Sequence, residues 1–169
     1  LNIGTFHSVC AKILRYHANL IGFNSDFTIY DQSDSRQLFK EVINELALDV
    51  KKFIPKTCQS IISSAKNMMK GPEDVHMLTE GYLTEKIGDI FKLYQEKLLK
   101  NNAFDFDDLI LKTIELFDKH LNILDVYQKK FSYVFLGREE TVINKGKFKI
   151  SFFDPKSNKF VSSTVNIPK

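Results

Sequence analysis

The stretch 101-NNAFDFDDLI-110 governs how this sequence is expected to fold. It places three carboxylates, Asp105, Asp107 and Asp108, within four positions, with two phenylalanines among them. Apolar residues then recur at helical spacing, so the sequence predicts a helix that begins directly after Asp105. Asp105 is then the N-cap, and Asp108 stands at the third helical position, where acids oppose the positive end of the helix dipole. Because the spacing matches neither a calcium loop nor a His-containing zinc set, helix capping is preferred to a metal site.

Outward from this stretch, most of the chain shows helical patterns. Asp31 precedes one apolar-periodic run as an N-cap, Pro55 suits the first position of another, and Gly71 ends that second run. Met68 and Met69 keep the same spacing and are predicted to be core residues. The predicted helices cover residues 8–21, 31–48, 55–70, 83–100, a segment from 106 onward, and 124–130.

Strand patterns are few and lie mostly near the C-terminus. FTIY (27–30) predicts a short extended segment, and FSYVFL (131–136) alternates and is rich in aromatic and β-branched residues, which predicts a strand. Beyond it, KFKISFF and KFVSSTVNI flank DPKSN, a cluster typical of a hairpin turn. The predicted fold class is mainly α, with a short strand and a C-terminal β-hairpin-like tail.

Composition bounds the class of protein. With 169 residues and 43% hydrophobic content, the chain is long enough for one domain with a core. Its two cysteines, Cys10 and Cys58, have neither disulfide-framework nor zinc spacing, which favours a reducing, cytoplasmic setting. No apolar run is long enough for a membrane span. The chain opens on Leu1 rather than Met, so we expect a fragment of a longer protein.

Charge is distributed unevenly along the chain. From Arg138 to Lys169, seven Lys or Arg residues stand against three acids, whereas the preceding residues are nearly balanced. The tail is therefore basic and the body is neutral. A neutral body does not exclude nucleic acid, because binding depends on local patches rather than on totals.

Five segments in a fixed order carry a resemblance to a known family. They are GTFHSVCAKILR (4–15), FTIYDQSD (27–34), ISSAKNMMKGPED (62–74), FDFDDLI (104–110) and YQKKFSYVF (127–135). In this order and at these separations they resemble the UvrD/PcrA/Rep group of superfamily one DNA helicases, over residues 3–135. In such helicases a RecA-like ATPase domain, 1A, is interrupted by a helical insertion, 1B.

The resemblance implies a division of the chain into four parts. Residues 1–22 correspond to part of domain 1A, 23–104 to the helical 1B-like insertion, and 105–136 to the return into 1A. Residues 137–169 form an unassigned basic β tail. On this alignment Asp105, Asp107 and Asp108 shape the junction between insertion and return and perform no chemistry.

The resemblance also implies two sets of DNA-binding residues. Thr5, Phe6 and His7 are expected to meet single-stranded DNA, since a hydroxyl and an imidazole N–H can hold phosphate oxygens and an aromatic ring can stack on a base. The structural alternative is that Thr5 caps a helix and His7 is a satisfied structural histidine. Lys66 and Asn67 are expected to contact the DNA backbone, and their alternative is a solvated helix face.

The ATPase elements of such helicases do not carry over. The strand resembling FSYVF should run into an Asp-Glu pair followed by Gln-Asp, but the sequence reads FLGREETVIN. A phosphate loop with Gly-Lys-Ser/Thr is also missing. ATP and Mg²⁺ are therefore expected for the parent enzyme, whereas no cofactor and no metal are expected for this chain alone.

Three hypotheses follow from the sequence. In the first, the chain is a fragment of an ATP-dependent DNA helicase, a 3′–5′ single-strand translocase, that contributes DNA binding and scaffold. Its partners are then single-stranded DNA, duplex junctions and the remainder of the helicase chain, with no membrane. In the second, it is a stand-alone helical interaction or nucleic-acid-binding module without motor activity. In the third, the similarity is coincidental.

Overall fold

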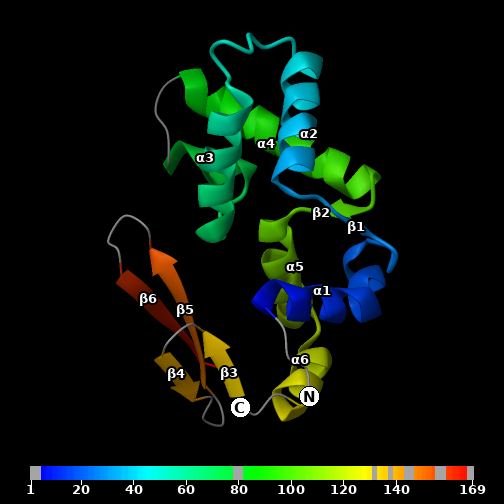
Figure 1. Ribbon diagram of the computed structural model, residues 1–169, viewed down its shortest axis with the longest axis vertical. Coiled ribbons are helices and arrows are strands. Elements are labelled where there is room, and N and C mark those ends of the chain that lie inside the picture. The colour runs from blue at the N-terminus through cyan, green and yellow to red at the C-terminus, as the bar shows by residue number, and fades with distance from the viewer. Residues whose placement is uncertain are drawn as a thin grey trace. The chain divides into compact units, whose positions relative to one another are not determined.

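The computed structural model divides the chain into two compact units, Leu1–Lys119 and His120–Lys169 (Figure 1). It describes the backbone of residues 5–77, 82–130, 133–136, 139–142, 147–154 and 159–166, and the side chains of residues 5–75 and 85–129. Each unit is treated by itself.

The first unit is mainly helical, as the sequence predicts. It contains the helices α1 (Phe6–His17), α2 (Gln32–Glu45), α3 (Pro55–Asn67), α4 (Tyr82–Lys100) and α5 (Phe106–Lys119), the 3-10 turns η1 (Ala18–Ile21) and η2 (Pro72–Met77), and the strands β1 (Thr28–Ile29) and β2 (Ala103–Phe104). No described helix is long and apolar enough to cross a membrane.

The helix starts follow the predicted capping signals. The Asp31 carboxylate accepts the backbone N–H groups of Ser33 and Asp34. The Asp31 N–H in turn donates to the Asp34 carboxylate, which makes a capping box. Pro55 is the first residue of α3. At α5, the Asp108 N–H donates to Oδ1 of Asp105 at 2.8 Å, so the predicted N-cap is confirmed.

Several predicted helix boundaries differ from the structure by a few residues, and the one at the end of α3 changes which residues are buried. The α3 helix ends at Asn67, and Met69 takes a φ of 56°, in the left-handed region. Met68 and Met69 are therefore 50% and 61% exposed and are not core residues. The spacing of the two methionines continues the helical pattern, but the backbone leaves the helix before them. Side chains beyond the end of a helix no longer share its buried face.

A parallel pair of two-residue strands forms the neck of the first unit. β1 pairs with β2 so that Thr28 lies opposite Ala103 and Ile29 opposite Phe104. Asn102 adds side-chain bonds: its Oδ1 accepts from the N–H of Asn24 at 2.9 Å, and its Nδ2 donates to Asp26 at 3.0 Å. The stretch 101–110 thus closes the neck before it starts α5.

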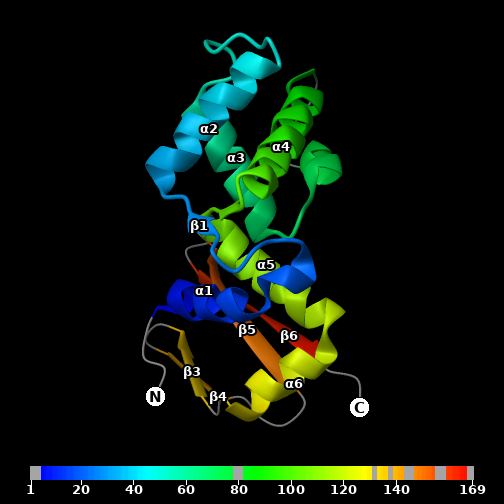
Figure 2. The same ribbon diagram turned by 90° about the vertical axis from the view of Figure 1, so that its right-hand side faces the viewer.

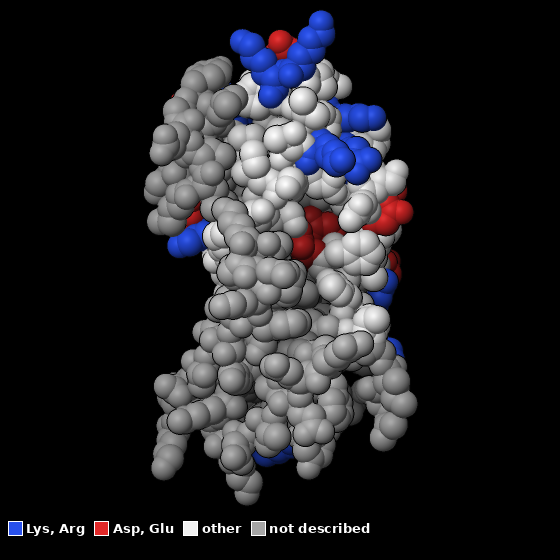
Figure 3. All heavy atoms as spheres, turned by 60° about the vertical axis from the view of Figure 1, so that its left-hand side comes forward, with Lys and Arg blue, Asp and Glu red and all other residues white. Residues whose placement is uncertain are grey.

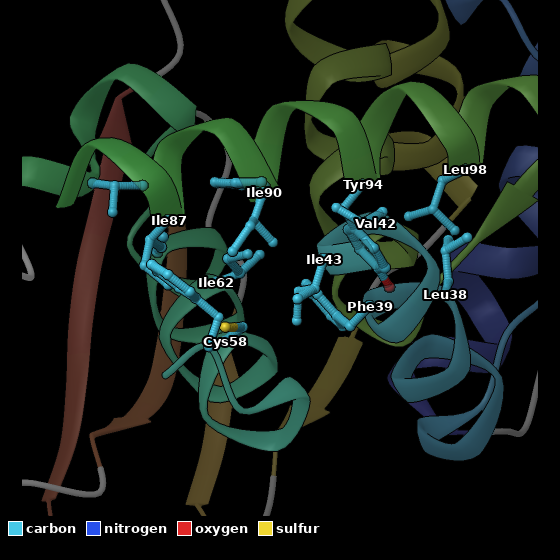
Figure 4. Packing of buried hydrophobic residues seen from close by; sticks show 14 of the residues in the cluster. Leu38, Phe39, Val42, Ile43, Cys58, Ile62, Ile87, Ile90, Tyr94 and Leu98 are labelled. Carbon is cyan, nitrogen blue, oxygen red and sulfur yellow. The ribbon is translucent and has the colours of Figure 1, made fainter. Parts of the chain in front are cut away.

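Two hydrophobic clusters lie on either side of this neck. The larger cluster joins α2, α3 and α4, and Figure 4 shows Ile90 and Tyr94 of α4 directed toward side chains of α2 and α3. The Tyr94 ring stacks on Phe39 with centroids 4.0 Å apart. The smaller cluster joins α1 and α5 through Leu14, Phe104 and their neighbours. Figures 1 and 2 show the α2–α4 group and the α1–α5 group separated by β1 and β2.

The second unit begins with the helix α6 (Leu121–Lys130), followed by the strands β3 (Tyr133–Leu136), β4 (Glu139–Val142), β5 (Lys147–Asp154) and β6 (Lys159–Asn166). β3 pairs antiparallel with β4, a strand that the sequence patterns did not single out. β5 pairs antiparallel with β6, with Asp154 opposite Lys159 at the closed end. The residues between them, 155–158, lie outside the described residues.

Candidate nucleic-acid interface

The residues expected to bind DNA at the N-terminus lie at the start of α1. Thr5 is the N-cap, and its Oγ1 accepts the backbone N–H of Ser8 at 3.3 Å. Phe6 is the first helical residue and is 41% exposed, and His7 is half-buried beside it. Thr5 therefore does cap the helix, as the structural alternative held. Capping occupies one lone pair of an exposed hydroxyl and leaves a further acceptor and the hydroxyl proton available.

An aromatic residue that sequence reasoning did not assign to the site completes this region. The ring of Phe106, the first residue of α5, lies edge-on to the His7 imidazole, with centroids 5.9 Å apart and planes at 85°. Phe106 is 45% exposed. No local pattern distinguishes Phe106 as a surface residue, because its spacing of three from Leu109 fits a buried helical stripe equally well.

Lys66 lies at the centre of a buried ionic cluster. Its Nζ is 2.6 Å from Oδ2 of Asp105 and 2.9 Å from Oδ1 of Asp108, and the lysine side chain is 1% exposed. The hydroxyl of Tyr94 donates to the same Asp105 oxygen at 3.0 Å. Gln95 donates to Asp108 at 3.4 Å. We call Lys66, Asp105, Asp108 and Tyr94 the ionic cluster.

The electrostatics of the ionic cluster follow from two carboxylates sharing one ammonium. Burial alone lowers the pKa of Lys66, but Asp108 and Asp105 outweigh burial and raise this pKa above its ordinary value. Burial raises the pKa of Asp108, and the charge of Asp105 adds to that rise. Lys66 therefore stays charged, and burial together with the neighbouring Asp105 charge favours the protonated form of Asp108. Burial also raises the pKa of Tyr94, which keeps its hydroxyl proton as a donor.

The structure places Lys66 and Asn67 in different environments. Asn67 is exposed at the end of α3, as its expected role requires. Lys66 is neither on a solvated face nor open to phosphate, since its ammonium already has two internal partners. Sequence spacing could not show this, because the nearer of the two carboxylates, Asp105, lies 39 positions further along the chain.

Asp107 differs from the two acids beside it. It is half-buried, and burial raises its pKa, while a hydrogen bond from Ser63 and the charges of Lys66 and His7 act in the opposite direction. Asp107 therefore faces both α3 and the start of α1. The three acids of the opening stretch thus have separate roles, with Asp105 as the cap, Asp108 in the ionic cluster and Asp107 at the surface.

A cavity of about 280 Å³ opens beside Phe106 and Asp107, between α2 and α3. The residues that line it include Arg36 of α2 and Lys56 and Lys66 of α3. The Nε of Arg36 is buried and has no hydrogen-bond partner within the described part of the chain. On the face seen in Figure 3, Lys and Arg side chains lie above recessed Asp and Glu side chains.

Among the side chains of residues 5–75 and 85–129, no group of three His, Cys, Asp or Glu could hold a metal ion. The carboxylates of Asp105 and Asp108 already share the ammonium of Lys66. Glu139 and Glu140 lie in β4, and their side chains are outside the described residues.

Fold and site together define a helical module that leaves and returns through a two-strand neck, beside two helix starts with exposed polar and aromatic side chains. Residues 1–136 match the UvrD/REP helicase N-terminal domain. The chain therefore belongs to this family. Residues 137–169 lie outside the matched range.

Curated relatives agree with this assignment. The ATP-dependent DNA helicase PcrA of Bacillus subtilis (strain 168) is 45% identical over 132 residues, which make up 78% of this chain and 18% of that protein. The proteins of the same name from Staphylococcus epidermidis and Staphylococcus aureus are 37% identical over 146 residues, or 86% of this chain and 20% of theirs. The chain thus spans about a fifth of the length of these relatives.

Proposed function

We propose that this chain is the DNA-binding and scaffolding part of an ATP-dependent DNA helicase. Family membership supports the class of enzyme, and the helical module with its neck supports the scaffold role. On this proposal residues 23–104 are the 1B-like insertion and residues 1–22 and 105–136 belong to domain 1A. The pairing of Thr28 with Ala103 and Ile29 with Phe104 lies close to both ends of that insertion.

The observation that carries the DNA-binding proposal is the contact between His7 and Phe106. It joins the starts of α1 and α5 into a single patch in which Phe6 and Phe106 are 41% and 45% exposed. The first N–H groups of a helix have no internal partner, and the helix dipole favours negative charge there. The start of α1, whose first turn carries no acid, therefore suits phosphate, and the exposed rings beside it suit unstacked bases.

Each side chain of this patch has a distinct task. The Thr5 hydroxyl and the His7 ring N–H donate to phosphate oxygens, and the rings of Phe6 and Phe106 stack on bases. Asn67, exposed at the end of α3, supplies a further amide for the backbone. Such contacts read no base edge, so the binding is independent of sequence.

The parent enzyme supplies the motor. ATP and Mg²⁺ bind to parts of the helicase that this chain does not provide, and the remainder of the helicase chain is its partner. Single-stranded DNA and duplex junctions are the substrates, with translocation in the 3′–5′ direction.

Fluorescence anisotropy with labelled single-stranded oligonucleotides tests the DNA patch. The full chain is expected to bind weakly, and His7→Ala and Phe106→Ala are each expected to weaken binding without lowering the melting temperature. Tyr16→Ala is the matched control, since Tyr16 is an aromatic residue of α1 that is 81% exposed. A chain ending at Phe135 separates any binding by the basic tail. Absence of binding at low salt, or binding that depends only on the tail, contradicts the proposal.

A second candidate is a stand-alone helical nucleic-acid-binding module without motor activity. The observation in its favour is that Leu1–Lys119 forms a compact unit by itself. The two candidates differ in the gene. A reading frame that continues into a phosphate loop and the magnesium carboxylates supports the helicase, and a frame that lacks them supports the module.

A further inference from the structure

Lys66 connects α3, in the proposed 1B-like insertion, to the N-cap of α5, the helix that follows the insertion. It belongs to α3, whereas its closest partner, Asp105, is the N-cap of α5 and is bonded through its other oxygen to the helix. The residue that follows Asp105 is Phe106, whose ring meets His7. The Lys66 ammonium therefore binds the residue directly before Phe106, whose ring belongs to the proposed DNA patch.

The cap is held from several directions at once. Its Oδ2 accepts from Lys66 at 2.6 Å and from Tyr94 at 3.0 Å, while its Oδ1 accepts the Asp108 N–H at 2.8 Å. A carboxylate with three short donors from three helices has little freedom to rotate. Since the backbone at Asp105 is fixed in this way, the direction in which Phe106 leaves the helix start is fixed as well.

We infer that Lys66 is a positioning residue for DNA binding: by holding Asp105 it sets the place of Phe106 against His7, although its own ammonium reaches no DNA. This inference rests on the proposed DNA patch. A residue with a purely structural role changes stability alone, and a residue that contacts phosphate changes the salt dependence of binding. A positioning residue changes affinity and leaves the salt dependence unchanged.

The variants are chosen so that the protein folds. Lys66→Met alone leaves two buried carboxylates without a counter-ion, so the test variant is Lys66→Met with Asp105→Asn and Asp108→Asn. This combination is uncharged, and asparagine remains a good N-cap. The matched control is Asp108→Asn, which keeps the Lys66–Asp105 pair. Lys92→Met, at an exposed lysine of α4, controls for the loss of a surface charge.

Two measurements are made on the full chain and on each variant. The first is the affinity for an unstructured single-stranded oligonucleotide over a range of salt concentrations. The second is the nuclear Overhauser effect between the His7 and Phe106 rings, which needs no DNA. The triple variant is expected to bind roughly tenfold more weakly, the loss that misplacing one stacking ring produces. Its salt slope is expected to equal that of the parent, and its ring contact to be lost.

Each other result overturns the inference. Unchanged affinity in a folded triple variant means that the ionic cluster is only structural. A salt slope reduced by about 0.7, the value for one phosphate on a single strand, means that Lys66 contacts DNA directly. An equal loss of affinity in the Asp108→Asn control means that the ion pair between Lys66 and the N-cap Asp105 does not cause the weaker binding.

Failure of the proposed function gives a different pattern. If the parent binds no oligonucleotide, the DNA proposal fails, and the ring contact alone decides whether Lys66 positions Phe106. Its persistence in the triple variant then overturns the positioning role. If the triple variant does not fold, Asp105→Asn takes its place, since it leaves a neutral Lys66–Asp108 pair. Unchanged affinity or a persistent ring contact in Asp105→Asn overturns the inference, and the salt slope is then compared in Lys66→Met.

Discussion

The ammonium of Lys66 and the carboxylate of Asp105 form an ion pair of 2.6 Å inside the protein, with the lysine side chain 1% exposed. A buried pair adds little stability compared with apolar packing, but removing one partner leaves an uncompensated charge. Lys66→Met is therefore expected to lower the free energy of unfolding by about 3–5 kcal/mol. Denaturant unfolding measures this change.

Asp108→Asn is the informative contrast. It leaves one ammonium with one carboxylate, and it removes the group whose pKa burial raises. We expect the free energy of unfolding to stay within about 1 kcal/mol of the parent. A loss as large as that of Lys66→Met is the result that speaks against an excess negative charge in the ionic cluster.

Stability is expected to fall at alkaline pH. The pKa of Lys66 is raised from 10.5, and that of Tyr94 is raised from 10.0. Above these values the unfolded chain releases protons that the folded chain retains, so rising pH stabilises the unfolded state relative to the folded state. The free energy of unfolding therefore decreases by up to about 1.4 kcal/mol per pH unit for each such group. Burial raises the pKa of the Cys58 thiol from 9.0 to about 11, so this group adds a fall of the same sign from a lower pH. Urea unfolding above about pH 10 measures the slope, and Tyr94→Phe is expected to make it shallower.

Asn102 is expected to be sensitive to substitution. It takes a φ of 47° and bonds both Asn24 and Asp26 across the neck. Asn102→Ala loses both bonds and places a side chain in the left-handed region, at a cost of about 1–3 kcal/mol. Asn102→Gly loses the same bonds without the backbone strain and is expected to be less destabilised by about 1 kcal/mol. Equal melting temperatures for these two variants argue against strain at this position.

The first unit is expected to fold without the second. Both hydrophobic clusters are built from residues between Cys10 and Ile110. A chain ending at Lys119 should therefore keep a cooperative thermal transition and its helical circular dichroism signal. A broad, non-cooperative melt for the shortened chain, with a sharp one for the full chain, contradicts this prediction.

This chain by itself is expected to hydrolyse no ATP. Its sequence contains no Gly-Lys-Ser/Thr segment, and FLGREE stands where the Asp-Glu pair is expected. Phosphate release is measured with and without Mg²⁺ and single-stranded DNA. Release that depends on magnesium and rises with DNA in a pure preparation overturns the prediction.

Local features of the sequence determined the helices and their starts. Asp31, Pro55 and Asp105 fix three helix starts because an N-cap oxygen or a first-position proline acts within one turn. Helical spacing also placed Leu38, Ile62 and the other residues that α2, α3 and α4 contribute to the larger cluster, but not Phe53, Val75 and Ala103. These signals are readable because cause and effect lie within four residues of each other.

Tertiary structure alone decided what these elements bring together. Periodicity assigns a lysine to a helix face, but only the approach of α5 to α3 shows that Lys66 is enclosed by two carboxylates. The packing of α1 against α5 likewise puts Phe106 beside His7, 99 positions away in the sequence. The positive φ at Met69 exposes two methionines whose spacing suggested burial. Contacts at such separations depend on how whole helices pack, and the free energy of that packing is not contained in any local pattern of residues.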